Sequence, residues 1–291
     1  MMIPDNTALA LLLTIFAGLS TGIGSAIAYF IKKPKLSYLS FALGLSAGVM
    51  SYISCVELLA AGIEGVGEEA SVAAFFLGVL FIGVIDQFIP EEKNPHEFKG
   101  LDDKQDHAFD KIIAGHSHGP KSSKESSEIL APGSEGNAGM EHPLMRTGIF
   151  TALAIGIHNF PEGLATFGTA LTDPQLGAFI ALAIAIHNIP EGISVSIPIF
   201  YATGDRKLAF KYSFLSGVAE PIGAIVGFLF LLPLIESDWV LPSLLSFVAG
   251  IMIYISLDEL LPMAHNYGRG HLVITGTMVG MLIMAVSLIM I

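Results

Sequence analysis

The chain has 291 residues, of which 53% are hydrophobic and 14% are charged, and its formal net charge at pH 7 is −12. Soluble domains carry about a quarter charged residues, so this composition is typical of an integral membrane protein. The acidic balance argues strongly against a nucleic-acid partner, because nucleic-acid-binding proteins need a basic surface.

Long apolar runs recur along the chain, and each is close to or above the ~20 residues that a helix needs to cross a bilayer. Helices are the expected form, because backbone groups in lipid must be hydrogen-bonded within the segment. We therefore predict an all-α integral membrane protein with eight transmembrane helices, embedded in a lipid bilayer. The runs cover residues 7–31, 36–61, 70–89, 146–171, 174–200, 207–232, 239–263 and 271–291.

The basic residues predict the orientation of these helices. All 14 Lys and Arg residues lie in the connections that follow the first, third, fifth and seventh runs, or within the first residues of the next run. These connections share one side of the membrane, which is the cytoplasmic side by the positive-inside rule. We therefore expect both termini to be extracytoplasmic.

Two internal repeats relate distant parts of the chain. "ALAIGIHNFPEG" from Ala152 is nearly repeated as "ALAIAIHNIPEG" from Ala181, and "AGVMSYISCVELL" from Ala47 resembles "AGIMIYISLDELL" from Ala249. In both cases the two copies lie on predicted helices that cross the membrane in opposite directions. This pattern indicates a pseudo-twofold axis in the membrane plane, as in secondary transporters that bind substrate near the midplane.

The repeats divide the chain into a 3+2+3 inverted-repeat arrangement. Residues 1–89 hold three helices, residues 145–201 hold a central hairpin with both HNxPEG motifs, and residues 202–291 hold three more helices. Residues 90–144 are polar and rich in Gly and Ser, which predicts a flexible cytoplasmic loop. The histidines of this loop fit metal sensing and a plain solvated linker about equally well.

The doubled motif places polar side chains deep in the predicted membrane. Its two histidines lie equally far in sequence from the hairpin turn, about 20 Å along the helix axis. In each copy, His and Glu are four residues apart and share a helix face, with Asn beside them. These six residues are His158, Asn159, Glu162, His187, Asn188 and Glu191.

Prolines accompany the acidic residues of this region. Pro161 and Pro190 each remove one helical hydrogen bond, which frees a carbonyl or opens the helix beside a site. The same combination recurs in the sixth predicted helix, where Glu220 directly precedes Pro221 at a similar depth.

Three carboxylates near the membrane midplane are too costly to lack a function. Two divalent cations would neutralise them, and a set of His, Glu and Asn ligands suits Zn²⁺, Fe²⁺, Co²⁺ or Mn²⁺. Met50 lies at comparable depth and could add a thioether ligand, although core packing explains it equally well. We expect the metal to be a transported substrate, with no cofactor.

Further acidic residues lie along the second and seventh predicted helices. Glu57 is displaced toward the outside, whereas Asp258 and Glu259 are displaced toward the cytoplasm, with His265 beyond them. We predict that these residues line the outer and inner parts of a transport path. The alternative is that they lie near helix ends and reach the headgroup region.

Together, HNFPEG, HNIPEG, the Glu220–Pro221 step and "ISLDELLPMAHNYG" at 255–268 resemble the ZIP (Zrt-, Irt-like protein) metal transporters, most closely the bacterial zinc-uptake subgroup. The resemblance covers all eight predicted helices. It implies uptake of Zn²⁺, and also of Fe²⁺, Mn²⁺, Co²⁺ or Cd²⁺, across the inner membrane into the cytoplasm. It further implies a homodimer and an elevator-like movement of the central helices.

The resemblance also implies a two-metal site between the fourth, fifth and sixth helices, with a contribution from the second. Carried onto matching positions, its ligands are Met50, His158, Asn159, Glu162, His187, Asn188, Glu191 and Glu220.

Two other functions fit parts of this pattern. An intramembrane metal-dependent hydrolase would use a metal-bound water, but the sequence has no HExxH motif and a hydrolase does not explain the inverted duplication. A cation channel would select ions by rings of carboxylates, and its flux would not saturate. We expect a carrier that works by alternating access rather than an enzyme.

Overall fold

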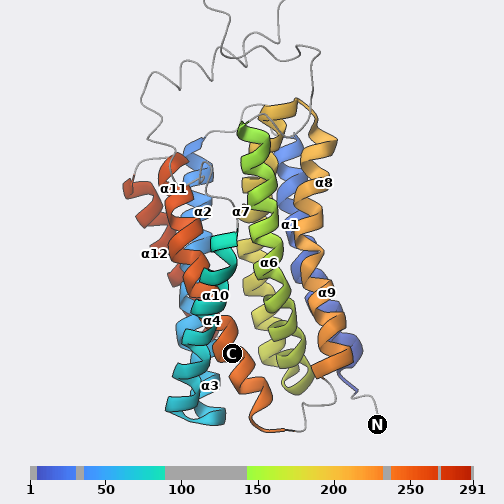
Figure 1. Cartoon of the computed structure of the whole chain (residues 1–291), viewed down its shortest axis with the longest axis vertical. Coiled ribbons are helices and arrows are strands. Elements are labelled where there is room, and N and C mark those ends of the chain that lie inside the picture. The colour runs from blue at the N-terminus through green and yellow to red at the C-terminus, as the bar shows by residue number, and fades with distance from the viewer. Residues whose placement is uncertain (1–4, 31–35, 89–142, 232–236, 268–269, 290–291) are drawn as a thin grey trace, which may run out of the picture.

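The computed structural model describes residues 5–30, 36–88, 143–231, 237–267 and 270–289, and these form helices joined by short turns (Figure 1). The predicted loop at 90–144 lies almost wholly outside the described residues. The elements are α1 (Thr7–Phe30), α2 (Leu36–Ile53), η1 (Ser54–Leu58), α3 (Leu59–Val66), α4 (Glu68–Phe88), α6 (Pro143–Thr172), α7 (Pro174–Thr203), α8 (Arg206–Gly217), α9 (Ala219–Val226), η3 (Gly227–Leu231), α10 (Val240–Ile255), η5 (Ser256–Leu260), α11 (Leu261–Tyr267) and α12 (Gly270–Ile289).

Seven helical segments of the described chain are long and apolar enough to cross a membrane. They include α1, α4, α7 and α12, together with three composite segments in which shorter helices follow one another without a loop. The remaining long helix, α6, has 30 residues and carries the first polar motif. The all-helical membrane fold predicted from the apolar runs is therefore confirmed, whereas the 3+2+3 arrangement and the sides of the termini stay predictions.

The turn between α6 and α7 is set by two residues. The Asp173 side chain accepts hydrogen bonds from the backbone N–H groups of Gln175 and Leu176, both at 3.0 Å, and so caps the start of α7. Pro174 occupies the first helical position, where its missing N–H costs nothing. Because Asp173 alone separates the two helices, α6 and α7 form a tight antiparallel hairpin.

Two π-helical turns occur at matching positions of the second repeat. The η1 turn begins at Ser54 and contains Glu57, and the η5 turn begins at Ser256 and contains Glu259. The hydroxyl of Ser54 donates to the carbonyl of Met50 at 2.6 Å, and that of Ser256 donates to the carbonyl of Met252 at 2.7 Å. The repeat seen in the sequence is thus also a repeat of local structure, and π-turns are frequent at functional sites.

The helices pack in two groups, which lie on opposite sides of Figure 1. The motif group consists of α1 and of α6 to η3 (residues 7–30 and 143–231), and the flanking group consists of α2 to α4 and α10 to α12 (residues 36–88 and 240–289). Helix α7 contacts α2, and α6 contacts α10, so the hairpin forms the boundary between the groups.

Close backbone approaches at glycines hold each group together. In the motif group, a side-chain carbon at Gly24 of α1 would collide with the carbonyl of Ile189 in α7, and one at Gly192 would collide with the carbonyl of Thr21. In the flanking group, α2 and α12 approach equally closely at Gly48, and α10 and α4 do so at Gly250. Small residues allow such contacts between membrane helices.

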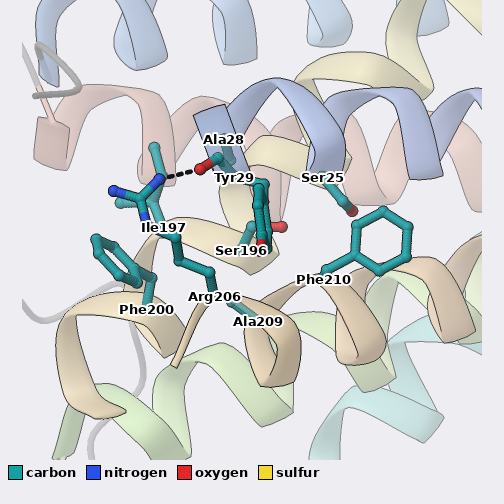
Figure 2. Close-up of a pocket in the computed structure, with 9 residues that line it drawn as sticks. All are labelled: Ser25, Ala28, Tyr29, Ser196, Ile197, Phe200, Arg206, Ala209 and Phe210. Atoms are coloured by element: carbon teal, nitrogen blue, oxygen red, sulfur yellow. Dashed lines mark hydrogen bonds between the residues drawn. The ribbon is translucent and has the colours of Figure 1, made fainter. Parts of the chain in front are cut away.

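Two contacts define the ends of the motif group. At one end, the Arg206 guanidinium donates to the carbonyl of Tyr29 and lies over the Phe200 ring, 4.7 Å from its centroid (Figure 2). At the other end, the Asn6 amide donates to the carbonyl of Leu171 at 3.4 Å. Helix α1 therefore runs antiparallel to α6 and parallel to α7.

Candidate metal site

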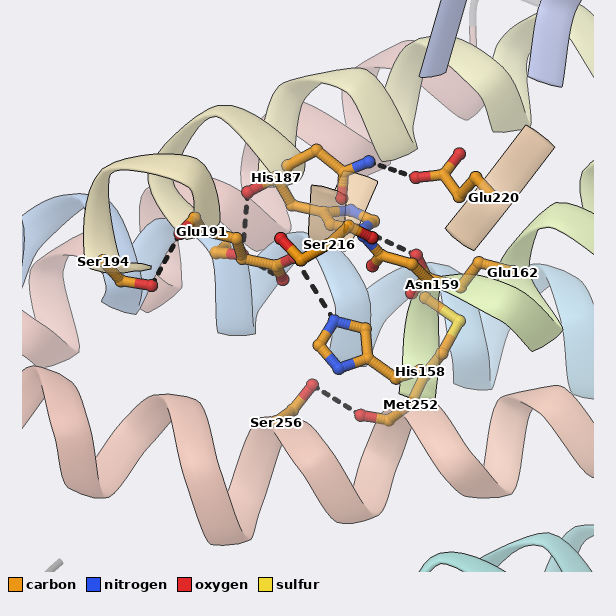
Figure 3. A network of polar contacts seen from close by, with 12 residues as sticks. His158, Asn159, Glu162, His187, Glu191, Ser194, Ser216, Glu220, Met252 and Ser256 are labelled. Atoms are coloured by element: carbon orange, nitrogen blue, oxygen red, sulfur yellow. Dashed lines mark hydrogen bonds and ion pairs between the residues drawn. The ribbon is translucent and has the colours of Figure 1, made fainter. Parts of the chain in front are cut away.

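The two copies of the HNxPEG motif lie in the middle of α6 and α7, facing each other across the hairpin (Figure 3). Both helices continue through their prolines, Pro161 and Pro190. The motif residues therefore keep helical spacing, and His and Glu of each copy lie on the same helix face.

The motif side chains are fully enclosed by protein. Relative exposure is 1% for Glu162 and 0% for the other five His, Asn and Glu residues of the motif. Glu220 from α9 is also 0% exposed. Burying this many charged and polar groups is expensive unless they are paired or bind metal, so the region has the properties of a functional site.

The ion pairs of the site cross the hairpin. Nε2 of His158 lies 3.3 Å from Oε2 of Glu191, and Nε2 of His187 lies 3.4 Å from Oε2 of Glu162 (Figure 3). Each histidine is thus paired with the glutamate of the other copy, rather than with the glutamate four residues along its own helix. The near-equal distances show that the sequence repeat is also a repeat of the site geometry.

Glu220 joins the site because the sixth predicted helix is interrupted. Helix α8 ends at Gly217, and α9 begins at Ala219, so Val218 separates them just before Pro221. Oε1 of Glu220 accepts a hydrogen bond from the amide of Asn188, which also donates to the carbonyl of Ala17 at 3.1 Å.

The other asparagine of the motif makes a similar contact. The Asn159 amide donates to the carbonyl of Ser216 at 3.3 Å, next to the interruption between α8 and α9. Each asparagine therefore donates from its amide nitrogen to a protein acceptor. Its side-chain carbonyl oxygen has no hydrogen-bond partner among the described residues.

One contact was not expected from the sequence. Ser46 of α2 is fully buried, and its hydroxyl donates to the carbonyl of His187 at 3.2 Å and to Oε1 of Glu191 at 3.4 Å. A single serine in an apolar helix carries no pattern of its own. The second repeat offers the one sequence signal: Ser46 directly precedes its first copy, whereas the apolar Val248 directly precedes its second copy.

Several buried atoms of the site have no hydrogen-bond partner among the described residues, and all of them are good metal ligands. Buried polar atoms are normally paired, so a cluster of unpaired ones needs an explanation. Carboxylate, imidazole and amide groups of this kind bind divalent first-row metals. The atoms are Nδ1 of His158, Oδ1 of Asn159, Oε1 of Glu162, Nδ1 of His187, Oδ1 of Asn188 and Oε2 of Glu220.

The acidic and imidazole side chains meet in pairs. Among the described residues, no three His, Cys, Asp or Glu side chains are arranged to hold one ion together. These groups therefore form two His–Glu pairs rather than a three-ligand cluster of those residue types.

The methionines of the second repeat lie on α2 and α10, the two flanking helices that contact the hairpin. Met50 is fully buried in the apolar core on α2. Met252 on α10 is also buried, and Figure 3 shows its side chain extending toward the motif residues of α6. The assignment of Met50 as a ligand remains a prediction.

The predicted path residues occupy the flanking group. Glu57 is half-buried in η1, and Asp258 and Glu259 are half-buried in η5. Glu259 lies within electrostatic reach of His158, which links η5 to the site. His265 in α11 is exposed, and its ring contacts the carbonyl of Leu261 at 2.7 Å.

A small pocket lies elsewhere, at the ends of α1 and α7 and the start of α8, where Arg206 reaches Tyr29 (Figure 2). None of its nine lining residues belongs to the doubled motif. The candidate site itself is a packed group of polar side chains, since each of them is at most 1% exposed.

Fold and site together define an all-helical, multi-span membrane protein with buried metal-ligand side chains at its centre. Residues 7–288 match the family model described as ZIP Zinc transporter, and the chain belongs to that family. It is a family of transporters rather than enzymes, as predicted.

Curated relatives match over nearly their whole length. The chain is 51% identical to "Zinc transporter ZupT" of Clostridium perfringens, covering 98% of this chain and 97% of the relative. It is 50% identical to the proteins of the same name from Oceanobacillus iheyensis and Nitratidesulfovibrio vulgaris. The alignments cover 98% and 99% of this chain, respectively, and 99% of each relative.

Proposed function

We propose that this protein carries Zn²⁺ across the cell membrane into the cytoplasm by alternating access. The observation that carries the proposal is the group of six unpaired, fully buried ligand atoms on the HNxPEG motifs and Glu220. The names of the relatives point to the same ion. Fe²⁺, Mn²⁺, Co²⁺ and Cd²⁺ are further candidate ions, because the same ligand types accept them.

The site has enough ligands for two ions. One ion would use His158 and Glu191, and the second would use His187 and Glu162. The two asparagines and Glu220 would complete the shells, with Met50 as the contribution from α2. In support, the pairing across the hairpin already brings each histidine to a carboxylate of the opposite copy.

Alternating access needs a path on each side of the site. We place Glu57 on the outer path and Asp258, Glu259 and His265 on the inner path. The matching π-turns that carry Glu57 and Glu259 support a shared role, because such turns re-aim side chains without ending the helix. They also support the inverted-repeat arrangement, with three helices before the hairpin and three after it. The distribution of basic residues leads us to place both termini outside.

Uptake of ⁶⁵Zn²⁺ into proteoliposomes tests the proposal. We compare the native protein with Glu162→Gln and Glu191→Gln, which keep the side-chain shape but remove the charge. Asp238→Asn serves as a control, because Asp238 is an exposed carboxylate in a turn outside the site. Each variant is first checked for a monodisperse folded state.

We expect saturable uptake by the native protein and the control, and uptake reduced at least ~10-fold in both motif variants, because each loses a ligand charge. Flux that rises without saturation would indicate a channel. Zinc binding without any uptake would contradict the transporter, and a peptide hydrolysis assay would then test the metalloenzyme.

A further inference from the structure

The two glutamates of the doubled motif are not equivalent, although their sequence surroundings nearly are. Both oxygens of Glu191 have a partner: Oε2 faces His158, and Oε1 accepts from Ser46. In Glu162, only Oε2 has a partner, and Oε1 is buried and unpaired among the described residues. The motif itself cannot cause this difference, because it is the same in both copies.

The cause lies in the flanking group. Ser46 precedes the α2 copy of the second repeat by one residue, and Val248 holds the same position before the α10 copy. Both side chains are fully buried, α2 contacts α7, and α10 contacts α6. At the position where α2 presents a hydroxyl to α7, the α10 copy carries a buried valine, whose side chain has no hydrogen-bonding group.

The geometry of Ser46 suits a hydroxyl that serves two acceptors. Its distances to the carbonyl of His187 and to Oε1 of Glu191, 3.2 and 3.4 Å, exceed the ~2.7–2.8 Å of a simple O–H···O bond. One shared hydrogen explains both lengths, because bifurcated bonds are longer than simple ones. Ser46 thus contacts the backbone of one motif residue and the carboxylate of another, one helical turn apart.

We propose that Ser46 is a positioning residue that orients Glu191 for metal and makes the Glu191 half of the site bind more tightly than the Glu162 half. This proposal rests on the proposed function. Hydrogen bonds to ligating carboxylates fix their orientation, and removing such a partner typically lowers metal affinity 10- to 100-fold. Ser46 also ties this orientation to the boundary between the two helix groups, since it is on α2 and Glu191 is on α7.

The test compares two residues of nearly equal shape at one position. Ser46→Thr keeps a hydroxyl, whereas Ser46→Val removes it and installs the residue that the chain already carries at 248. Ser46→Ala is the third variant, because it creates no crowding if the larger side chains do not fit. Ser40→Ala is the matched control: Ser40 is also a buried serine of α2 that donates to another helix, through the carbonyl of Ala264 at 2.8 Å.

Two quantities are measured for each folded variant: the half-saturating Zn²⁺ concentration for uptake, and Zn²⁺ binding to purified protein by titration calorimetry. We expect Ser46→Val and Ser46→Ala to raise the half-saturating concentration and to weaken binding by about 10-fold. The maximal rate should stay within about twofold. Ser46→Thr and Ser40→Ala should resemble the native protein.

The outcomes separate this proposal from the one on which it rests. If Ser46→Val and Ser46→Ala have the same half-saturating Zn²⁺ concentration and the same Zn²⁺ affinity as the native protein, the positioning role is overturned and zinc transport is unaffected. Equal losses in Ser46→Thr and Ser46→Ala would show that packing, and not the hydroxyl, matters. A native protein that neither binds nor moves zinc would instead overturn the proposed function itself.

Discussion

At the scale of single residues, the histidine of each motif copy faces the glutamate of the other copy. The helical spacing of each motif copy places His and Glu on one helix face, and the contacts across the hairpin show that the two copies lie level with each other. Sequence spacing could not identify the partners, because the rotation of α6 against α7 decides which side chains meet. It also missed Ser46, whose contact depends on how α2 packs against α7 and not on any local pattern.

The cross-hairpin pairing predicts a specific energetic coupling. We expect His158→Ala and Glu191→Gln each to destabilise the metal-free protein, since either change leaves a buried polar partner uncompensated. The double variant should lose less free energy of unfolding than the two single variants lose together, which corresponds to a coupling energy of about 0.5–3 kcal/mol in a double-mutant cycle. Unfolding in detergent without metal measures each free energy.

The control for this double-mutant cycle is a second cycle on His158 and Glu162, which lie four residues apart on the same helix. Its coupling should be smaller, because Glu162 is paired with His187. A larger coupling for His158 with Glu162 than with Glu191 would mean that the pairs form within each helix.

At the scale of helices, the apolar runs predicted the elements well. The predicted run at 7–31 is observed as α1, and the observed breaks at Asp173 and Gly204 follow from capping and turn residues that can be read directly. The π-turns η1 and η5 were not foreseen. One extra residue in a helical turn leaves an apolar pattern almost unchanged, so only the structure reveals it.

The close approach of α1 to α7 yields a prediction about glycine. In Gly24→Ala, the added methyl group would meet the Ile189 carbonyl, which cannot move without separating the helices. We expect a loss of about 1–3 kcal/mol in the free energy of unfolding, which is typical of overpacking.

Gly156→Ala in α6 is the matched control for that substitution. Its added carbon would lie 3.9 Å from the nearest atom, an ordinary contact. There the change should be neutral or stabilising by up to ~1 kcal/mol, since alanine favours helix. Equal destabilisation by the two substitutions in thermal unfolding would argue against a tight α1–α7 interface.

At the scale of the whole molecule, the tight glycine contacts lie within the two groups. The α2–α7 contact includes the long, shared hydrogen bonds of Ser46. Close-packed backbones transmit movement as units, whereas a boundary with weaker contacts is where two units can slide. We therefore expect the motif group to move relative to the flanking group during transport.

Spin-label distances test this movement. A label on the exposed Cys55 of the flanking group and one on Leu229→Cys of the motif group should change their separation when Zn²⁺ is added. In a control variant with Cys55→Ser, labels on Leu182→Cys and Leu229→Cys should keep the same separation, because both labelled positions lie in the motif group. A larger change within the motif group than between the groups would contradict a rigid-unit movement.

The three buried carboxylates of the site also have an electrical consequence. Each divalent ion adds two positive charges to the side chains that hold it, so the loaded and empty sites differ in charge. Moving one unit charge through the full membrane field changes its energy by about 2.3 kcal/mol per 100 mV. If the motif group carries the site through part of that field, a negative cell interior draws the loaded site inward more strongly than the empty one. The resting voltage would then give uptake its direction even when the zinc gradient is shallow.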